Sequence, residues 1–218
     1  MPEHDSRNVP HAGGAAVQLL IASSNPGTLR EYRGLAENGP AGLALTLDLL
    51  PGFSGLPPFE ESAPTFAENA ASKAIHYSRL GNGLVVADDS GLVVPALGGA
   101  PGVHSARYAG PGASDADCVA KLLLALRGIK SADRHARFVC DVALAERGRV
   151  IAVFSDFVEG EIAVQPRGSE GFGYDPVFFF PALGKTFAEI PPDRKNLLSH
   201  RGKAFRKLLE FLASSPML

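Results

Sequence analysis

The sequence predicts an α/β protein, in which strands and helices follow one another along a chain of 218 residues. The apolar run Val17–Ala22 leads into a turn-forming loop and an amphipathic segment, the pattern of a strand, a turn and a helix. A second apolar run, Leu84–Ala87, ends at two adjacent aspartates. Two longer strand-like runs, Arg137–Glu146 and Val150–Val158, are joined by a short turn and predict a long antiparallel ribbon.

The other predicted elements follow in order. They are a helix over residues 28–37, a strand over 43–50, helices over 65–80 and 114–126, a strand over 177–180 and a helix over 204–212. Thr65 and Glu68 fit a capping box at the start of the second helix. Residues 1–16 are polar or small and predict a disordered tail. No internal repeat or low-complexity linker divides the rest, so residues 17–215 are expected to form a single domain.

Composition excludes several classes of protein. Apolar residues make up 45% of the chain, enough for a substantial core, and a net charge of -2 gives no general electrostatic reason to bind nucleic acid. Cys118 and Cys140 form neither a disulfide framework nor a metal motif, and Cys140 is expected to be buried. Neither a signal peptide nor an apolar run of about 20 residues is apparent. We therefore expect a cytoplasmic protein with no nucleic-acid or membrane partner.

The stretch from Ala87 to Tyr108 carries the first indication of chemistry. Asp88 and Asp89 end an apolar run, and Ser90-Gly91 is expected to turn the chain. Ligands of open α/β sheets bind at strand ends, and adjacent carboxylates repel one another, so they usually need a nearby cation. The alternative is a surface turn, since all four residues favour turns.

Two other segments indicate anion binding. The loop Ser23–Gly27 precedes a helix, so its amides and the helix dipole would attract a phosphate. It lacks the Gly-Lys-Ser/Thr ending of a P-loop. Lys73 shares a helix face with Thr65 and Asn69 at i, i+4 spacing, although most such lysines are merely solvated.

Aromatic and basic clusters complete the pattern. The segment Gly168–Pro176 places two aromatic residues and an acid among glycines, and aromatic rings can stack on a base. Ser199–Lys203 puts basic side chains at a helix start, which opposes the helix dipole unless an anion or acceptor lies opposite. Carboxylates, cations and aromatic faces together predict a metal–nucleotide site.

The chain carries six motifs in an order that resembles the inosine/xanthosine triphosphate pyrophosphatase family, also called Ham1-like or dITP/XTP pyrophosphatases. They are SSNPG, TFAENAASKA, ADDSGLVVPALGGAPGVHSARYAG, GFGYDP, GKTFAE and SHRGKA, spread between Val17 and about Leu212. The resemblance implies an elongated fold with a mixed, strongly twisted sheet, flanking helices, two lobes around a nucleotide-binding cleft and a homodimer. It also implies Mg²⁺-dependent hydrolysis of deaminated purine nucleoside triphosphates (ITP, dITP, XTP, dXTP) to the monophosphate and pyrophosphate, which cleanses the nucleotide pool.

The resemblance also implies roles for single residues. Asp89 would be the catalytic acid, a proton acceptor and Mg²⁺ ligand, although physical reasoning does not separate it from Asp88. Glu61 would be the second metal-binding acid, with Glu60 as the alternative. The implied substrate contacts are Ser23, Ser24, Asn25, Pro26, Gly27, Thr28, Lys73, Ser90, Phe172, Gly173, Tyr174, Asp175, Lys185, His200 and Arg201. The first six and Lys73 would hold phosphates, and the Phe172–Asp175 loop would pack on the base.

Base choice follows in part from hydrogen bonding. A 6-oxo purine presents an acceptor where adenine presents a donor. Arg201 and a charged His200 donate but do not accept, so the pocket is expected to reject ATP. GTP also carries a 6-oxo group, and the sequence gives no reason for its exclusion.

Two departures from the family pattern stand out. Thr28 occupies a position where many members have Lys, which predicts weaker triphosphate affinity or compensation by Arg30. His104 stands where an aromatic residue is expected and is taken as a packing residue. Two alternative functions remain: a pyrophosphatase for other modified nucleotides, and a catalytically weak nucleotide-binding sensor. The motifs Phe172–Asp175 (the base loop) and Ser199–Arg201 argue against the first. The retained residues Asp88, Asp89, Glu61 and Lys73 argue against the second.

Overall fold

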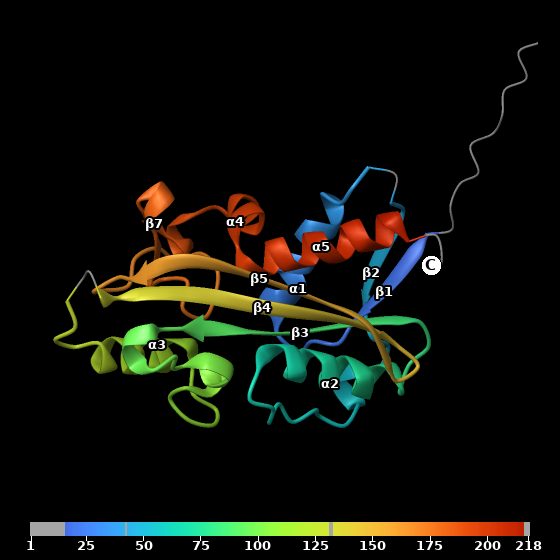
Figure 1. Cartoon of the computed structure of the whole chain (residues 1–218), viewed down its shortest axis with the longest axis horizontal. Coiled ribbons are helices and arrows are strands. Elements are labelled where there is room, and N and C mark those ends of the chain that lie inside the picture. Colours follow the sequence, from blue (N-terminus) through green and yellow to red (C-terminus); the bar gives the residue numbers. More distant parts are fainter. Residues whose placement is uncertain (1–15, 42, 131–132, 216–218) are drawn as a thin grey trace, which may run out of the picture.

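A computed structural model describes residues 16–41, 43–130 and 133–215, so nearly all of the predicted N-terminal tail lies outside the described residues (Figure 1). The described strands form one seven-stranded sheet in the order β2-β1-β3-β4-β5-β6-β7. Their bounds are β1 Val17–Ile21, β2 Leu45–Leu49, β3 Leu84–Val93, β4 His135–Glu146, β5 Arg149–Ile162, β6 Phe178–Phe180 and β7 Lys185–Thr186. β1 pairs in parallel with β2 and β3, and the other pairs are antiparallel, which confirms the predicted mixed sheet.

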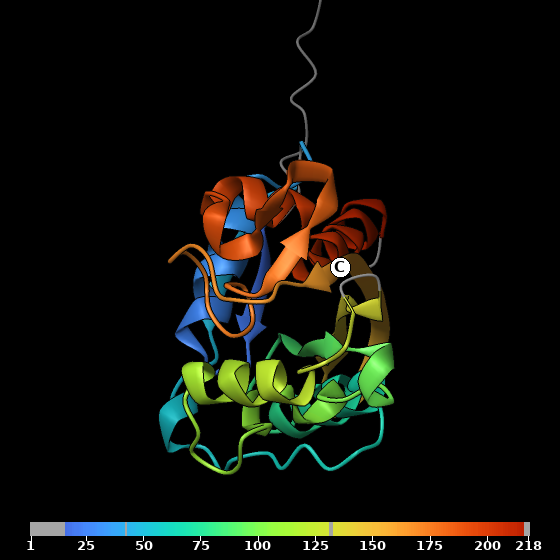
Figure 2. The ribbon, with the colours of Figure 1, turned by 90° about the vertical axis from the view of Figure 1, so that its left-hand side faces the viewer.

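Helices cover both faces of this sheet. They are α1 Pro26–Glu37, α2 Phe66–Ser78, α3 Asp115–Ala125, α4 Pro192–Leu198 and α5 His200–Ser214. α1, α4 and α5 lie on one side of the long strands, and α2 and α3 on the other (Figures 1 and 2). In the part of the chain that the structure describes, no helix has the length and apolarity to cross a bilayer.

Apolar clusters between the sheet and its helices form the core. Tyr32 of α1 and Phe205 of α5 pack in one cluster, where their ring centroids are 4.6 Å apart. Ala70 and Ala74 of α2 are fully buried in a second. Small residues on α2 allow a close approach to the strands, which fixes the helix relative to the centre of β3.

β3 is continuous, and the turn predicted at Ser90-Gly91 is wrong. The strand pairs with β4 in register from Val85 to Val93. Gly91 serves close packing instead, since a Cβ there would clash with Ser105 Oγ and would lie 2.6 Å from the Gly102 carbonyl oxygen. The two aspartates therefore lie within a strand, where successive side chains point to opposite faces.

The predicted ribbon is confirmed as β4 and β5, which are longer than predicted and run along the molecule (Figure 1). α1 begins two residues before the predicted start, because Asn25 caps it and Pro26 takes the first helical position. α4 was not predicted. The pair Pro191-Pro192 could have indicated it, since proline is favoured in the first turn of a helix. Cys118 and Cys140 are free and buried, as expected for Cys140.

Candidate functional site

A cavity of about 750 Å³ lies beside the middle of β3, where the start of α1, the loop before α2 and the start of α5 meet. Its volume suits a small organic ligand. Most of the predicted site residues line it: Ser23, Ser24, Asn25, Thr28, Glu61, Lys73, Asp89, Ser90, Phe172, Gly173, Tyr174, Asp175, His200 and Arg201. Segments far apart in the sequence therefore meet at one site, as the motifs predict.

Asp88 and Asp89 have different surroundings. Asp89 accepts a hydrogen bond of 2.8 Å from Asn69 Nδ2 on α2. Asp88 accepts one of 3.2 Å from Arg201 Nε on α5. The two carboxylates thus bond to different helices, although both line the cavity.

Burial sets the protonation of Asp89. Loss of hydration, followed by the negative charge of Glu61, raises its pKa from 3.8 to about 7. The hydrogen bond from Asn69 and the charge of Lys73 act in the opposite direction without cancelling the rise. A carboxylate with a pKa near neutrality is a suitable general base.

The second predicted acid, Glu61, is paired with Lys73. Lys73 Nζ lies 2.5 Å from Glu61 Oε1. Burial alone would lower the pKa of Lys73, but Asp88, Glu61 and Asp89 together raise it, so the lysine is charged. Glu60 is exposed and does not line the cavity, which favours Glu61 over this alternative.

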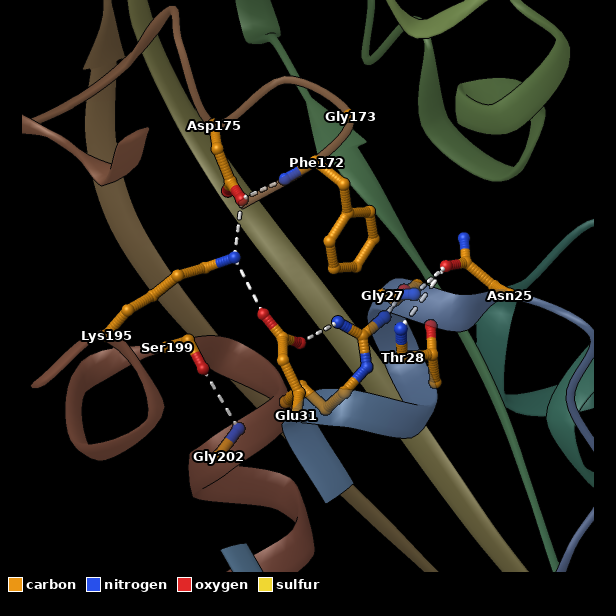
Figure 3. A network of polar contacts seen from close by, with 12 residues as sticks. Asn25, Gly27, Thr28, Glu31, Phe172, Gly173, Asp175, Lys195, Ser199 and Gly202 are labelled. Atoms are coloured by element: carbon orange, nitrogen blue, oxygen red, sulfur yellow. Dashed lines mark hydrogen bonds and ion pairs between the residues drawn. The ribbon is translucent and has the colours of Figure 1, made fainter. Parts of the chain in front are cut away.

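The loop before α1 is organised by Asn25. Its Oδ1 accepts hydrogen bonds from the backbone N–H groups of Gly27 at 2.8 Å and Thr28 at 3.2 Å (Figure 3). These two backbone amides, which were expected to bind a phosphate, are therefore already bonded to the cap. Pro26 and Gly27 do not line the cavity. Gly27 instead backs the base loop, because a Cβ there would lie 2.5 Å from the Phe172 ring.

The loop Gly171–Asp175 presents one aromatic face rather than two. Phe172 lies half-buried in the cavity, with Lys195 Nζ 5.0 Å from its ring centroid and Arg201 Cζ 5.6 Å from it. Tyr174 is buried, and its hydroxyl donates to the Ser105 carbonyl at 2.8 Å, so it anchors the loop. Gly173 has a φ of 61° and donates its N–H to Asp115 of α3 at 2.7 Å.

A buried network of ions borders the base loop, and sequence reasoning missed two of its members. Glu31 of α1 accepts from Lys195 Nζ at 2.7 Å and Arg201 Nη1 at 2.5 Å, and Lys195 also lies 2.5 Å from Asp175 (Figure 3). Burial alone would raise the pKa of Glu31, but the two cations lower it. Arg201 further donates to Ser90 Oγ at 2.7 Å. Lys195 and Glu31 lacked a sequence signal because the first lies on the unpredicted α4 and the second in an ordinary helical pattern.

His200 does not behave as predicted. It stacks on Phe138 with ring centroids 4.7 Å apart, and its Nδ1 has no hydrogen-bond partner among the described residues. Burial, followed by the charges of Arg201 and Lys195, holds its pKa well below the usual value. The imidazole is therefore neutral and can accept as well as donate, so the expectation of a purely donating base pocket is wrong at this position.

Three further expectations need correction. Lys185 is exposed on β7 and does not line the cavity, whereas Lys195 does. Arg30 is exposed and outside the cavity, so its placement does not support compensation for Thr28, which is 4% exposed at the start of α1. His104, expected to pack, is exposed in the turn of 3-10 helix Gly102–Arg107.

The acids suit a hard divalent cation. Asp89 and Glu61 line the same cavity. Within residues 16–41, 43–130 and 133–215, no three His, Cys, Asp or Glu side chains group together as a complete protein metal site. Mg²⁺ is commonly held by one or two carboxylates together with water and substrate phosphates. The donor set therefore fits magnesium brought together with a phosphorylated ligand.

Comparison with protein families identifies similar proteins. A model of the Ham1 family matches residues 19–211. A dITP/XTP pyrophosphatase of Geobacillus kaustophilus is 49% identical over 193 residues, which are 88% of this chain and 93% of the relative. A dITP/XTP pyrophosphatase of Gloeobacter violaceus is 48% identical over 193 residues, 88% of this chain and 92% of the relative.

Solved structures agree with this similarity. A HAM1 protein from Coxiella burnetii superposes with a TM-score of 0.81 at 41% identity, covering 91% of this chain and all of the other. A nucleoside-triphosphatase/dITP/XTP pyrophosphatase from Mycobacterium abscessus gives a TM-score of 0.65 at 39% identity, covering 90% of this chain and all of the other.

Proposed function

The chain belongs to the Ham1 family, and on this basis we propose that it hydrolyses deaminated purine nucleoside triphosphates (ITP, dITP, XTP and dXTP) to the monophosphate and pyrophosphate. Such an enzyme removes these nucleotides from the pool, an activity that fits the cytoplasmic location expected from the sequence. The observation that carries the proposal is that one cavity is lined both by Asp89, Glu61 and Lys73 and by the Phe172–Asp175 loop.

The chain's own residues supply most of the proposed chemistry. Mg²⁺ bound at Asp89 and Glu61 would neutralise phosphate charge and lower the pKa of a bound water. Asp89 takes the proton of the water that attacks the α-phosphorus. Asp88 also lines the cavity but is paired with Arg201, so we assign the proton transfer to Asp89. Lys73 is charged and stabilises the leaving pyrophosphate.

Recognition of the base is assigned to the buried ionic network. Phe172 offers a stacking surface, and Lys195, Arg201 and the neutral His200 offer polar contacts. We propose that Lys195 makes the nucleotide contact that the family resemblance implies for Lys185. All of these contacts belong to one two-lobed domain over residues 17–215, a proposal supported by the sheet that its strands share.

The direct test is release of pyrophosphate from dITP, XTP, dATP and dGTP, with and without Mg²⁺. Mg²⁺-dependent release from dITP and XTP alone is the expected result. Equal turnover of all four nucleotides would contradict the proposed specificity. Binding of nucleotide without turnover would favour the sensor.

Replacing Thr28 with lysine is expected to tighten binding of the triphosphate. The added charge would lie at the start of α1, and a hydrogen bond to a charged group is typically worth about 1.5–3 kcal/mol. Steady-state kinetics of Thr28→Lys should show that KM for dITP falls by about tenfold or more. Arg30→Ala is the control, and it should leave KM unchanged because Arg30 is exposed outside the cavity. An unchanged KM in Thr28→Lys would contradict the prediction.

We also propose that the protein is a homodimer. Support comes from exposed apolar side chains on β5, where Ile151, Val153 and Phe157 are 40%, 39% and 47% exposed. Phe157→Asp is expected to yield a monomer at a concentration at which the unaltered protein is a dimer, as measured by light scattering after size exclusion. Leu124→Asp, on α3 and 60% exposed, is the control and should not change the mass. Equal masses for Phe157→Asp and the unaltered protein would place the interface elsewhere.

A further inference from the structure

The segment Pro57–Ala63, which carries Glu61, contains no helix or strand. No ladder of backbone hydrogen bonds therefore fixes the distance between Glu61 and Asp89. Pro57 and Pro58 also lack an N–H donor. What holds the segment must come from side chains of its neighbours.

Side chains of α2 hold it at successive turns, and Arg107 Nη2 donates to the Glu61 carbonyl at 2.8 Å. Tyr77 Oη accepts from the Phe59 N–H at 3.1 Å and donates to the Pro57 carbonyl at 3.3 Å. One turn earlier Lys73 meets the Glu61 carboxylate, and one turn earlier again Asn69 meets Ala63. Residues four apart lie on one helix face, so the segment runs antiparallel along α2.

Asn69 differs from the other two because it links the segment to β3. Its Oδ1 accepts from the Ala63 N–H at 2.9 Å, while its Nδ2 donates to Asp89 Oδ2 at 2.8 Å and lies 3.4 Å from the Ala63 carbonyl oxygen. The residue is 1% exposed, and Ala70 beside it is fully buried against the sheet. One rigid amide thus contacts both acid-bearing elements of the site.

We propose that Asn69 is a positioning residue of the metal site: its amide links the Glu61 segment to Asp89, and Tyr77 anchors the far end of that segment. This inference rests on the proposed function for the role of the two acids. Residues that orient metal ligands typically change metal affinity or activity about 10- to 100-fold when replaced.

The test separates positioning from stability. Mn²⁺, which is visible by electron paramagnetic resonance, is titrated into the protein with a dITP analogue whose α,β bridge is a methylene group. Asn69→Ala is expected to weaken Mn²⁺ binding about 10- to 100-fold and to lower kcat for dITP with little change in KM. Tyr77→Phe, which keeps the ring and loses the hydroxyl, should weaken Mn²⁺ binding less.

Ser78→Ala is the matched control. Ser78 is also a buried polar residue of α2, but its Oγ accepts from the Gly148 N–H at 2.9 Å, away from the cavity. Both alanine variants should lose thermal stability, and only Asn69→Ala should lose Mn²⁺ affinity. If Asn69→Ala does not fold, the Mn²⁺ affinities of Asn69→Ser and Tyr77→Phe are compared with that of Ser78→Ala instead.

Mn²⁺ affinity within twofold of the unaltered protein in a folded Asn69 variant would overturn the inference. This outcome is distinct from failure of the proposed function, in which the unaltered protein would release no pyrophosphate from dITP or XTP. An unaltered protein that binds no Mn²⁺ with the analogue would overturn both.

Discussion

Asp89→Asn is expected to make the metal-free protein more stable at pH 8 while it strongly lowers activity. Burial and the charge of Glu61 raise the pKa of Asp89 to about 7 in the folded state, against 3.8 for an ordinary aspartate. The folded protein thus binds this proton more tightly than the unfolded chain, so stability falls as pH rises from about 4 through 7. A shift of about three units corresponds to at most about 4 kcal/mol.

The measurement is urea unfolding in EDTA at several pH values. The variant should be more stable than the unaltered protein at pH 8, and the difference should vanish toward pH 4. Activity should fall about 10²- to 10⁴-fold through loss of the proton acceptor, besides any loss of metal. Equal stability of the two proteins at every pH would show that ionisation of Asp89 does not destabilise the folded protein.

Asp141 supplies a matched control. It lies directly opposite Asp89 in the β3–β4 register, is buried, and has a pKa that burial raises, but it does not line the cavity. Asp141→Asn should leave activity intact, although it also removes a buried acid. A loss of activity in both variants would mean that burial in this sheet, rather than contact with substrate, governs the result.

The sequence predicted much of the fold because its elements follow local rules. Asn25, Thr65 and Ser114 each cap a helix with a side-chain oxygen, and the apolar period of β4 and β5 is that of strands. The turn predicted at Ser90-Gly91 was wrong because glycine occurs both in turns and at positions where the backbone is closely packed. Turn propensity is local, whereas the close contact of Gly91 with Ser105 and Gly102 arises only in the folded chain.

The site was predictable where a motif carries the contact, and not where tertiary packing creates it. Asp89, Lys73 and Phe172 lie in recognisable motifs and line the cavity. Lys195 and Glu31 meet only because α1 and α4 pack on the same side of the sheet, so no spacing in the sequence indicates their pairing. The neutral state of His200 likewise depends on burial against Phe138, which its motif does not reveal.

Glu31→Ala is expected to destabilise the protein by about 3–5 kcal/mol, because it leaves two buried cations short of a counter-charge. The side chains of Glu31, Lys195 and Arg201 are 11%, 5% and 4% exposed, so water replaces little of the lost interaction. Asp175 and Asp88 remain as partners of the two cations, which places the loss within this range rather than above it. Urea unfolding at neutral pH measures the change.

Asp156→Ala is the control for this prediction, since it breaks the Lys207–Asp156 pair at 2.8 Å, in which the lysine is 49% exposed. Exposed pairs typically contribute about 0–1 kcal/mol and weaken in salt, whereas the buried network is screened much less. A loss of less than about 1 kcal/mol in Glu31→Ala would mean that Asp175 and Asp88 alone neutralise the two cations. In that case the role of Glu31 would be to contact the bound nucleotide. Its replacement should then change KM for dITP more than it changes stability.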